Sequence, residues 1–255
     1  MPRVPPVTRM TLSARRMPQT YTVISYLRGM AGWESSPLLA RIAAGEGLHL
    51  DFKQRIDSAR KVARTLSAFA NTAGGSLLIG VKDNGKICGI DPEQEYYMIE
   101  LSATRYIEPA VEFDTTIHLW EDKQVLEVYV PARVDLRPFY VREEDGTRRA
   151  YVRVGDKSRV AGGLLEALWW AEKKPQHIFF RRAEERLMAY LSTHAFIDEE
   201  TLRRILGPRE AWKARKILIK YTLIGVLRME VQLDKEVFFL AGEPPEGKLF
   251  PLRRS

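Results

Sequence analysis

The sequence predicts an α+β protein in which a mixed β-sheet is layered with helices, followed by a small winged helix-turn-helix domain. Three observations support this fold class. Residues 48–53 alternate between apolar and polar side chains, as in a half-buried strand. Residues 76–81 form a nearly uninterrupted apolar run, typical of a strand buried on both faces. Between these runs, apolar residues at helical spacing and a glycine pair predict a helix that ends in a turn.

Ordered structure is expected to begin at residues 36–44, where apolar residues have helical spacing. After the strand at 48–53, Ser58 can cap a second helix. The polar face of this helix is basic and carries Arg60, Lys61 and Arg64. Such a local cationic stripe can contact phosphate, so these three residues are candidate nucleic-acid contacts.

Turn signals and periodicity place the remaining elements of the central region. Asn71 and the pair Gly74-Gly75 tolerate positive φ and are expected to end the second helix. Residues 82–85 predict a tight turn, so that 86–90 is expected to return as a strand. The elements predicted next are a helix at 92–107, paired strands at 111–120 and 124–131, a strand at 151–154 and a closing helix at 162–173.

The C-terminal segment has the predicted element order of a winged helix-turn-helix, which is three helices and a two-stranded ribbon. The expected helices are 178–193, 198–207 and 209–221, and the expected strands are 223–229 and 236–240. In the third helix, Trp212, Ile217, Leu218 and Tyr221 are expected to face inward. Its cationic ridge consists of Arg209, Lys213, Lys216 and Lys220. We interpret this ridge as a nucleic-acid contact, with protein docking or dimerisation as the alternative role.

The net charge of +7 is distributed unevenly along the chain. Residues 1–33 contain five arginines and no acid, residues 34–177 contain 20 basic and 22 acidic side chains, and residues 178–255 contain 15 and 11. The central region is therefore slightly acidic, and nucleic-acid binding is expected to depend on the two ends. Residues 1–33 are expected to be a basic disordered arm, with a transit peptide or a later start at Met17 or Met30 as alternatives.

Cysteine, histidine and hydropathy patterns limit the class of protein. The single cysteine, Cys88, excludes an internal disulfide and a cysteine-built zinc site, and it fits a reducing cytoplasm. No apolar run approaches the roughly eighteen residues that a membrane span needs, so no membrane partner is expected. The four histidines lack ligand spacing, and only His49 shares a predicted strand face with Asp51 and Lys53.

Several motifs taken together resemble one known family. They are Glu46 with Asp51-Phe52-Lys53, the Ala-Phe-Ala-Asn-Thr-Ala-Gly-Gly run at 68–75, Ile79-Gly80-Val81 with Asp83, Gly89, and Tyr151 to Gly155 with Ser158 and Ala161. This set, over residues 40–172, is similar to the AlbA-type domain of the Schlafen group, found in bacterial proteins often labelled nucleic-acid-binding or ATP-binding. The resulting domain prediction is an arm at 1–33, a Schlafen AlbA-like domain at 36–173, a winged helix at 178–241 and a disordered tail at 242–255.

For the nuclease members of the group, the resemblance implies a three-carboxylate metal site, matched here by Glu46, Asp51 and Asp83. A bound Mg²⁺ or Mn²⁺ would neutralise the acids and orient water against a phosphodiester. Glu46 and Asp51 have opposite parity on a strand, so both reach one side only if the chain bends at its glycines. Asp51 also stands where those nucleases usually have Glu. The alternative is solvated or salt-bridged acids beside Lys53 and Lys82.

Two further kinds of ligand, ATP and phosphate, bear on the sequence. ATP binding is implied by the family label alone, because the chain lacks a Gly-x-x-x-x-Gly-Lys-Ser/Thr loop and its glycines fit turns. The segment 151–159 is expected to end a strand in a glycine turn whose cations and hydroxyl can hold phosphate oxygens. The additional candidate nucleic-acid contacts are Lys53, Arg153, Lys157 and Arg159.

These observations predict a cytoplasmic, bacterial nucleic-acid-binding regulator, for example of transcription, whose partner is DNA or RNA. A non-enzymatic role is favoured. The first alternative is a metal-dependent endoribonuclease that uses the three acids. The second is an ATP-binding or homo-oligomeric interaction protein without nucleic-acid activity.

Overall fold

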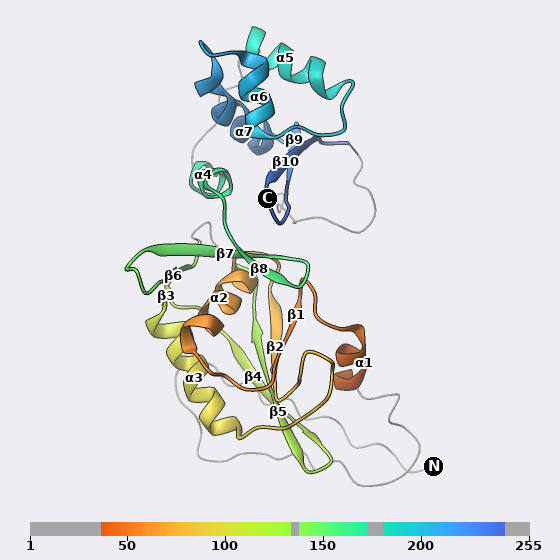
Figure 1. The fold of residues 1–255 in the computed structure, drawn as a ribbon, viewed down its shortest axis with the longest axis vertical. Coiled ribbons are helices and arrows are strands. Elements are labelled where there is room, and N and C mark those ends of the chain that lie inside the picture. Colours follow the sequence, from red (N-terminus) through yellow and green to blue (C-terminus); the bar gives the residue numbers. More distant parts are fainter. Residues whose placement is uncertain (1–36, 134–137, 173–180, 243–255) are drawn as a thin grey trace. The chain divides into compact units, whose positions relative to one another are not determined.

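The computed structural model describes residues 37–133, 138–172 and 181–242, which belong to two compact units (Figure 1). Unit 1 contains the described residues up to Arg133 and those from Phe139 to Val160. Unit 2 contains Pro138 and the described residues from Ala161 onward. The predicted basic arm, residues 174–177 between the two predicted domains and nearly all of the predicted tail lie outside the described residues.

Unit 1 is built on a four-stranded sheet with the order β1-β2-β5-β4. The strands are β1 (Leu50–Lys53), β2 (Gly75–Ile79), β4 (Asp114–Trp120) and β5 (Lys123–Val130). β1 and β2 are parallel and joined through helix α2 (Ala59–Ala70), whereas β2–β5 and β5–β4 are antiparallel. The predicted mixed sheet is therefore confirmed.

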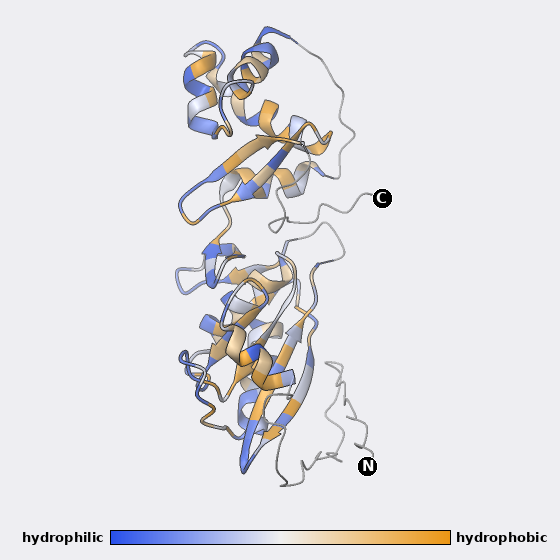
Figure 2. Cartoon of the chain, turned by 90° about the vertical axis from the view of Figure 1, so that its right-hand side faces the viewer, coloured by the Kyte–Doolittle hydropathy of each residue, from blue (hydrophilic) through white to orange (hydrophobic). Residues whose placement is uncertain are grey.

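Helices cover both faces of this sheet. Leu77, Ile79 and Leu126 share a buried core with α2 and with α3 (Pro92–Arg105). Alternate residues of the same strands, Leu78 and Val125, instead pack with Leu38 and Ile42 of α1 (Pro37–Ala44). Figure 2 shows hydrophobic residues concentrated in the strands of this unit, with hydrophilic residues at the turns.

A second, antiparallel sheet in unit 1 has the order β3-β6-β7-β8. Its strands are β3 (Ile107–Glu108), β6 (Tyr140–Arg142), β7 (Arg148–Val154) and β8 (Lys157–Val160), and α2 packs against β7 and β6. The sequence predicted only the second half of β7. Two- and three-residue strands have no measurable alternation, and β8 is polar along most of its length, so periodicity could not find them.

The turn after α2 depends on glycine, as predicted, but Asn71 has a different role. Asn71 is the helical C-cap with φ −77°, and the positive φ is at Gly74, +72°. A Cβ on Gly74 would lie 2.8 Å from the Ala132 nitrogen, and one on Gly75 would lie 2.4 Å from the Phe69 ring. Both glycines are therefore needed for close packing of the chain entering β2.

The predicted strand at 86–90 is wrong, although the turn before it is present. Lys82 donates its N–H to the Lys86 carbonyl, and Val81 forms a single bridge with Ile87. Beyond this bridge the N–H groups of Cys88 and Gly89 both donate to the Gly80 carbonyl, and Gly89 has φ +78°. The chain therefore folds back onto Gly80, which interrupts the ladder after one pair.

Unit 2 contains four α-helices and an antiparallel ribbon in its described part. They are α4 (Gly163–Ala171), α5 (Arg182–Leu191), α6 (Glu199–Leu206), α7 (Ala214–Leu223), β9 (Leu227–Val231) and β10 (Glu236–Leu240). The helix α4 was expected to close the central domain. Instead Leu164 belongs to the buried core of unit 2, and the Leu165 N–H donates to Glu236.

The predicted third helix of this region is divided in the structure. Arg209 lies in a turn, residues Ala211–Lys213 form a 3₁₀ turn, and α7 begins at Ala214. At about 100° per residue, position 212 lies on the opposite side of a helix from Ile217, Leu218 and Tyr221, so helical spacing itself directs Trp212 outward. Ile217, Leu218 and Tyr221 are buried as predicted, but Trp212 is 62% exposed, so its predicted inward position is wrong.

No helix within 37–133, 138–172 and 181–242 combines the length and apolar composition needed to cross a bilayer.

Candidate nucleic-acid interface

The chain bends sharply between the first predicted acid and the strand that carries the second. Gly45 has φ +79°, and the Gly47 N–H donates to the Leu50 carbonyl in a tight turn before β1. Glu46 therefore does not lie on the strand, and its Oε1 accepts a hydrogen bond from the Phe52 N–H at 2.7 Å. The bend that the three-carboxylate hypothesis required is present, but here it directs Glu46 to a backbone donor.

The second acid, Asp51, is buried and held by two cations. Its Oδ2 accepts from Lys53 Nζ at 2.7 Å, and its Oδ1 accepts from an Arg153 guanidinium nitrogen at 3.2 Å. Arg153 is only 1% exposed and also donates to the Gly47 and Leu50 carbonyls and to Ser158 Oγ. The prediction that Arg153 contacts nucleic acid is therefore wrong, because its guanidinium is occupied inside the fold.

The structure does not assemble the predicted metal site. Burial, then the neighbouring Asp51 and Asp83 carboxylates, raise the pKa of Glu46, while Phe52 N–H and Lys53 oppose the rise. The three acids thus share one electrostatic neighbourhood. Within the described ranges, however, no group of three metal-ligating side chains is placed to hold an ion. Asp51 forms ion pairs with Arg153 and Lys53.

A side-chain network centred on Asn71, which the sequence did not predict, connects the end of α2 to the second sheet. Asn71 Nδ2 donates to the Phe139 and Tyr151 carbonyls and to Ser67 Oγ, and Asn71 Oδ1 accepts from the Phe139 N–H. Asn71 is 3% exposed. A buried amide that meets four partners ties the end of α2 to the second sheet. The Asn in the run at 68–75 was the available signal, but a turn explains Asn equally well.

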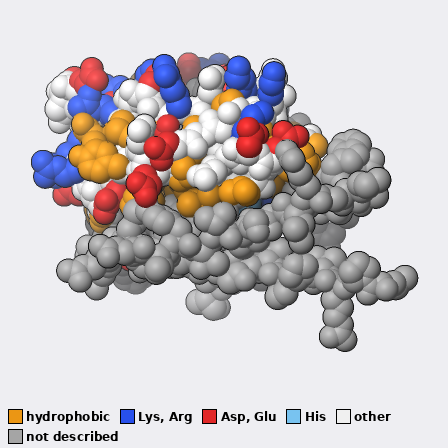
Figure 3. Space-filling model, turned by 90° about the horizontal axis from the view of Figure 1, so that it is seen from below, with side chains coloured by type: hydrophobic (Ala, Val, Ile, Leu, Met, Phe, Trp, Pro, Cys, Tyr) orange, Lys and Arg blue, Asp and Glu red, His pale blue; other side chains and the backbone are white. Residues whose placement is uncertain are grey.

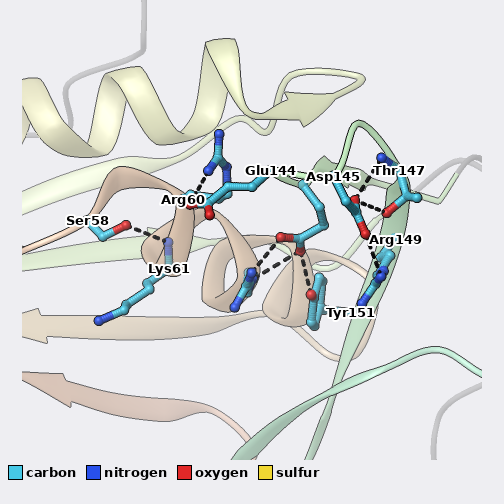
Figure 4. Close-up of polar contacts among 10 residues, drawn as sticks. Ser58, Arg60, Lys61, Glu144, Asp145, Thr147, Arg149 and Tyr151 are labelled. Atoms are coloured by element: carbon cyan, nitrogen blue, oxygen red, sulfur yellow. Dashed lines mark hydrogen bonds and ion pairs between the residues drawn. The ribbon is translucent and has the colours of Figure 1, made fainter.

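The basic face of α2 is present, yet its arginines are paired with acids from the turn before β7 (Figure 4). Arg60 forms an ion pair with Glu144, and Arg64 donates to both oxygens of Glu143, at 3.0 and 2.5 Å. Lys61 pairs with Asp57 at 3.2 Å. The predicted phosphate contacts on α2 therefore have intramolecular carboxylate partners, which a phosphate would have to displace.

Glu143 also binds a tyrosine. The Tyr151 hydroxyl donates to Glu143 Oε1 at 2.5 Å, and burial together with this carboxylate raises the pKa of Tyr151 to about 12. Burial would raise the pKa of Glu143, but the hydrogen bonds from Arg64 and Tyr151 outweigh it and lower that pKa. The network is charge-balanced and joins α2 to β7, which indicates a structural role.

The predicted phosphate-binding turn at 155–159 is partly a strand. Gly155, with φ +61°, makes the turn, but Lys157, Ser158 and Arg159 lie on the edge strand β8. Lys157 is exposed, while Ser158 Oγ accepts from the Arg153 guanidinium. Only Lys157 presents an exposed cation here, so the predicted cluster of phosphate donors is not assembled.

On the α1 side of the sheet, Glu46, His49 and Tyr129 line an open hollow of about 490 Å³. A second hydrogen-bond network, centred on Glu127, lies on the same side of the sheet. His49 Nδ1 is 3.0 Å from the Gly74 carbonyl. Nearby, Glu127 binds Arg41 and Ser76 at 2.7 Å and His118 at 2.8 Å. Burial would raise the pKa of Glu127, yet these hydrogen bonds lower it to about 2. Sequence analysis missed this cluster because its members are far apart in the chain.

Charge is mixed on the described part of the face of unit 1 that Figure 3 shows. From below, the described surface carries acidic and basic side chains next to one another (Figure 3). This agrees with the slightly acidic composition of the central region. A mixed surface gives no broad positive field for a nucleic-acid backbone.

The cations of α7 in unit 2 are arranged differently. Lys216 and Lys220 are four residues apart on the helix, and Lys213 precedes its first turn. Lys216 is exposed, and its ammonium lies 5.3 Å from the Trp212 ring centroid. Residues four apart lie on one side of a helix, so the structure retains three members of the predicted ridge. The fourth, Arg209, is exposed in the preceding turn.

One acid lies close to this ridge. Glu210 forms an ion pair with Lys213, and Arg186 approaches its other oxygen at 3.8 Å. The hydrogen bond and the positive charge of Lys213 lower the pKa of Glu210. Lys213 is therefore partly neutralised. Within α7, Lys216 is exposed, whereas Lys220 is half-buried.

Comparison with known proteins finds a family similar to the larger unit. Residues 46–162 match the model of the family described as "Schlafen, AlbA_2". The match ends two residues beyond unit 1 and includes Glu46, Asp51, the 68–75 run and Arg153. No curated protein matches the chain.

Solved structures that are similar to this chain include the following two. The first is the DIP2311 protein from Corynebacterium diphtheriae, with 21% identity and a TM-score of 0.37, covering 76% of this chain and 38% of that protein. The chain thus spans well under half of that structure. The second is the N-terminal domain of a protein from Nitrosomonas europaea titled as related to the ATP-dependent DNA helicase RecG, with 22% identity and a TM-score of 0.32, covering 57% of this chain and 93% of that domain.

Proposed function

Residues 46–162 match the Schlafen AlbA_2 family model, and we propose that this chain is a nucleic-acid-binding regulatory protein that contacts DNA or RNA through the cationic side of α7. The family assignment concerns unit 1, whereas the proposed contact lies in unit 2. The proposal therefore depends on the local chemistry of α7 and not on the family alone.

The main support for this proposal is that the cations of the two units differ in their partners and burial. In unit 1 the arginines of α2 are paired with Glu143 and Glu144, and Arg153 is buried. On α7, Lys216 is exposed beside an exposed aromatic ring, with Lys220 one turn further along. Lysines in a row on one helix side, of which Lys216 is exposed and Lys213 and Lys220 are half-buried, are suited to several phosphates of one strand.

The element order of unit 2 supports the same proposal. Helices α5, α6 and α7 are followed by the ribbon β9–β10, and Ile197, before α6, forms a bridge with Phe238 of that ribbon. In a winged helix-turn-helix, a helix in the position of α7 meets the nucleic acid. The winged-helix assignment is part of the proposal. So is a cytoplasmic location, which the one cysteine, Cys88, favours.

The nuclease alternative has less support. It needs three carboxylates free to bind a divalent ion, but Glu46 accepts from a backbone N–H and Asp51 is held by Arg153 and Lys53. These contacts favour a structural role, in which the two acids stabilise the turn that leads into β1.

Charge reversal tests the proposal. Fluorescence anisotropy with labelled DNA and RNA would compare the full chain with the double variant Lys213→Glu, Lys216→Glu. Reversing two phosphate contacts is expected to weaken binding about tenfold or more at low salt. The matched control is Lys82→Glu with Lys86→Glu in the turn after β2, which makes the same charge change in unit 1. Equal affinity of the α7 double variant and the parent chain would overturn the proposal.

A further inference from the structure

Trp212 is the most exposed of the large apolar side chains in the described part of unit 2, at 62%. Its exposure follows from its place in the turn of the helix, because at 3.6 residues per turn position 212 lies on the opposite side from the buried Ile217, Leu218 and Tyr221. A large aromatic ring left in water forgoes the free energy that burial would supply, so exposed tryptophans are enriched at binding surfaces.

Two cations lie beside this ring. The ammonium nitrogens of Lys213 and Lys216 are 5.6 and 5.3 Å from the ring centroid of Trp212. A ligand that fits here would offer a flat apolar surface to the indole and negative charge to the lysines. A nucleotide within a strand has both features, because its base can stack while its phosphates meet the ammonium groups.

The geometry of the contact around Trp212 indicates whether the bound nucleic acid is single-stranded or double-stranded. A base inside a duplex is already stacked on its neighbours, and separating it from them costs free energy. An unpaired base needs no such separation and can stack directly on an aromatic side chain. A single tryptophan with cations at its edge therefore suits an unpaired base better than a paired one.

We propose that Trp212, together with Lys213 and Lys216, is a stacking site for an unpaired base, so that the α7 surface binds single-stranded or frayed nucleic acid in preference to closed duplex. This inference rests on the proposed function, because it assigns a substrate class to the same surface. Lys220 continues the cationic side by one helical turn, about 6 Å along the axis, in the direction that a bound strand would follow.

The test compares two probes at one salt concentration: a fluorescein-labelled twelve-nucleotide thymidine strand and a blunt duplex of equal length. We expect Trp212→Ala in the full chain to weaken single-strand binding by about tenfold. Duplex binding is expected to change by less than about twofold. Trp212→Phe, which keeps a smaller stacking surface, is expected to fall between the parent chain and Trp212→Ala.

Tyr97→Ala is the matched control, because Tyr97 on α3 is 63% exposed and lies in unit 1. It should leave both affinities unchanged. A second readout is the quenching of tryptophan emission by the strand, which should be reduced in Trp212→Phe. Binding that persists with no dependence on Trp212, or that loses single strand and duplex equally, overturns the stacking site alone. Absence of binding to either probe overturns the proposed function as well.

Discussion

Arg153 and Asp51 meet across 102 positions of sequence, with a guanidinium nitrogen 3.2 Å from the Asp51 Oδ1 oxygen. Arg153 lies on β7 of the second sheet, and Asp51 lies on β1 of the first. The ion pair therefore joins the two sheets of unit 1 beside the end of α2. The sequence predicts Asp51 as a metal ligand and Arg153 as a nucleic-acid contact. In the structure, both side chains are buried and bind each other.

Loss of Arg153 is expected to destabilise unit 1 strongly. Arg153→Met would remove the donor to two carbonyls and leave the buried Asp51 carboxylate with Lys53 as its remaining cation. Breaking a buried ion pair from one side costs about 3–5 kcal/mol. Amide hydrogen exchange of the β2 strand would measure the change in opening free energy.

The control for this variant is Arg148→Met on the same strand, where the exposed Arg148 is 3.5 Å from Glu108. An exposed pair of this kind contributes about 1 kcal/mol or less. Equal effects of the two substitutions would refute a stabilising role of the buried ion pair.

Asn71 is expected to matter through its side chain and not through its backbone conformation. Asn71→Ala would leave the Phe139 and Tyr151 carbonyls without their amide donor, at a cost of about 2–4 kcal/mol. Asn84→Ala, in an exposed turn where one side-chain oxygen accepts from Lys86 N–H, should cost well under half of that. Thermal denaturation of both variants checks the difference, and a mild effect of Asn71→Ala would mean that water replaces the amide.

Glu127 gives unit 1 an acid-sensitive contribution to stability. Its folded-state pKa of about 2 lies below the ordinary value of 4.5. The contribution is therefore complete above pH 4.5 and is lost as the pH falls towards 2. The shift corresponds to about 3 kcal/mol at most.

Glu127→Gln should accordingly destabilise the chain near neutral pH, and the difference from the parent chain should shrink between pH 4.5 and pH 2. Urea denaturation followed by circular dichroism across this range measures it. Glu112→Gln, an exposed acid in the segment before β4, is the control. A difference that stays constant with pH would show that Glu127 acts through packing and not through its charge.

Sequence patterns predicted the large sheet well because its strands are long enough for periodicity to be read. The buried run at 76–81 and the hairpin at 111–131 correspond to β2, β4 and β5. The short strands β3 and β6 could not be predicted, since two or three residues carry no period. The strand expected at 86–90 was wrong because hydrogen bonds to Gly80 take over after one bridge.

Residue type and spacing were enough to find the candidate site residues. Whether those residues are accessible to a ligand could not be predicted in the same way. Arg60 and Arg64 are correctly on the outer face of α2, yet the acids that pair with them come from a turn about 80 residues later in the chain. The accessibility of the two arginines depends on long-range contacts that a linear pattern does not contain. The exposure of Trp212 could have been predicted, because at 3.6 residues per turn position 212 lies opposite the buried Ile217, Leu218 and Tyr221.

Removal of Glu210 is expected to strengthen nucleic-acid binding. Glu210 is the ion-pair partner of Lys213, so Glu210→Gln would release that ammonium for phosphate and remove a repelling charge. We expect the affinity for a labelled strand to rise several-fold at low salt, with a steeper salt dependence. Glu185→Gln on α5, where the acid is exposed, controls for the change in net charge. Equal gains in the two variants would argue against a specific role of Lys213.

The salt dependence of binding tests the central claim most directly. The measurement is the slope of log Kobs against log salt concentration for the parent chain, Lys216→Gln, Lys220→Gln and the control Lys86→Gln. If the lysines of α7 contact phosphates, each α7 substitution reduces the magnitude of the slope by about one, and Lys86→Gln leaves it unchanged. Unchanged slopes for both α7 variants, with binding intact, would contradict the assignment of α7 as the nucleic-acid interface.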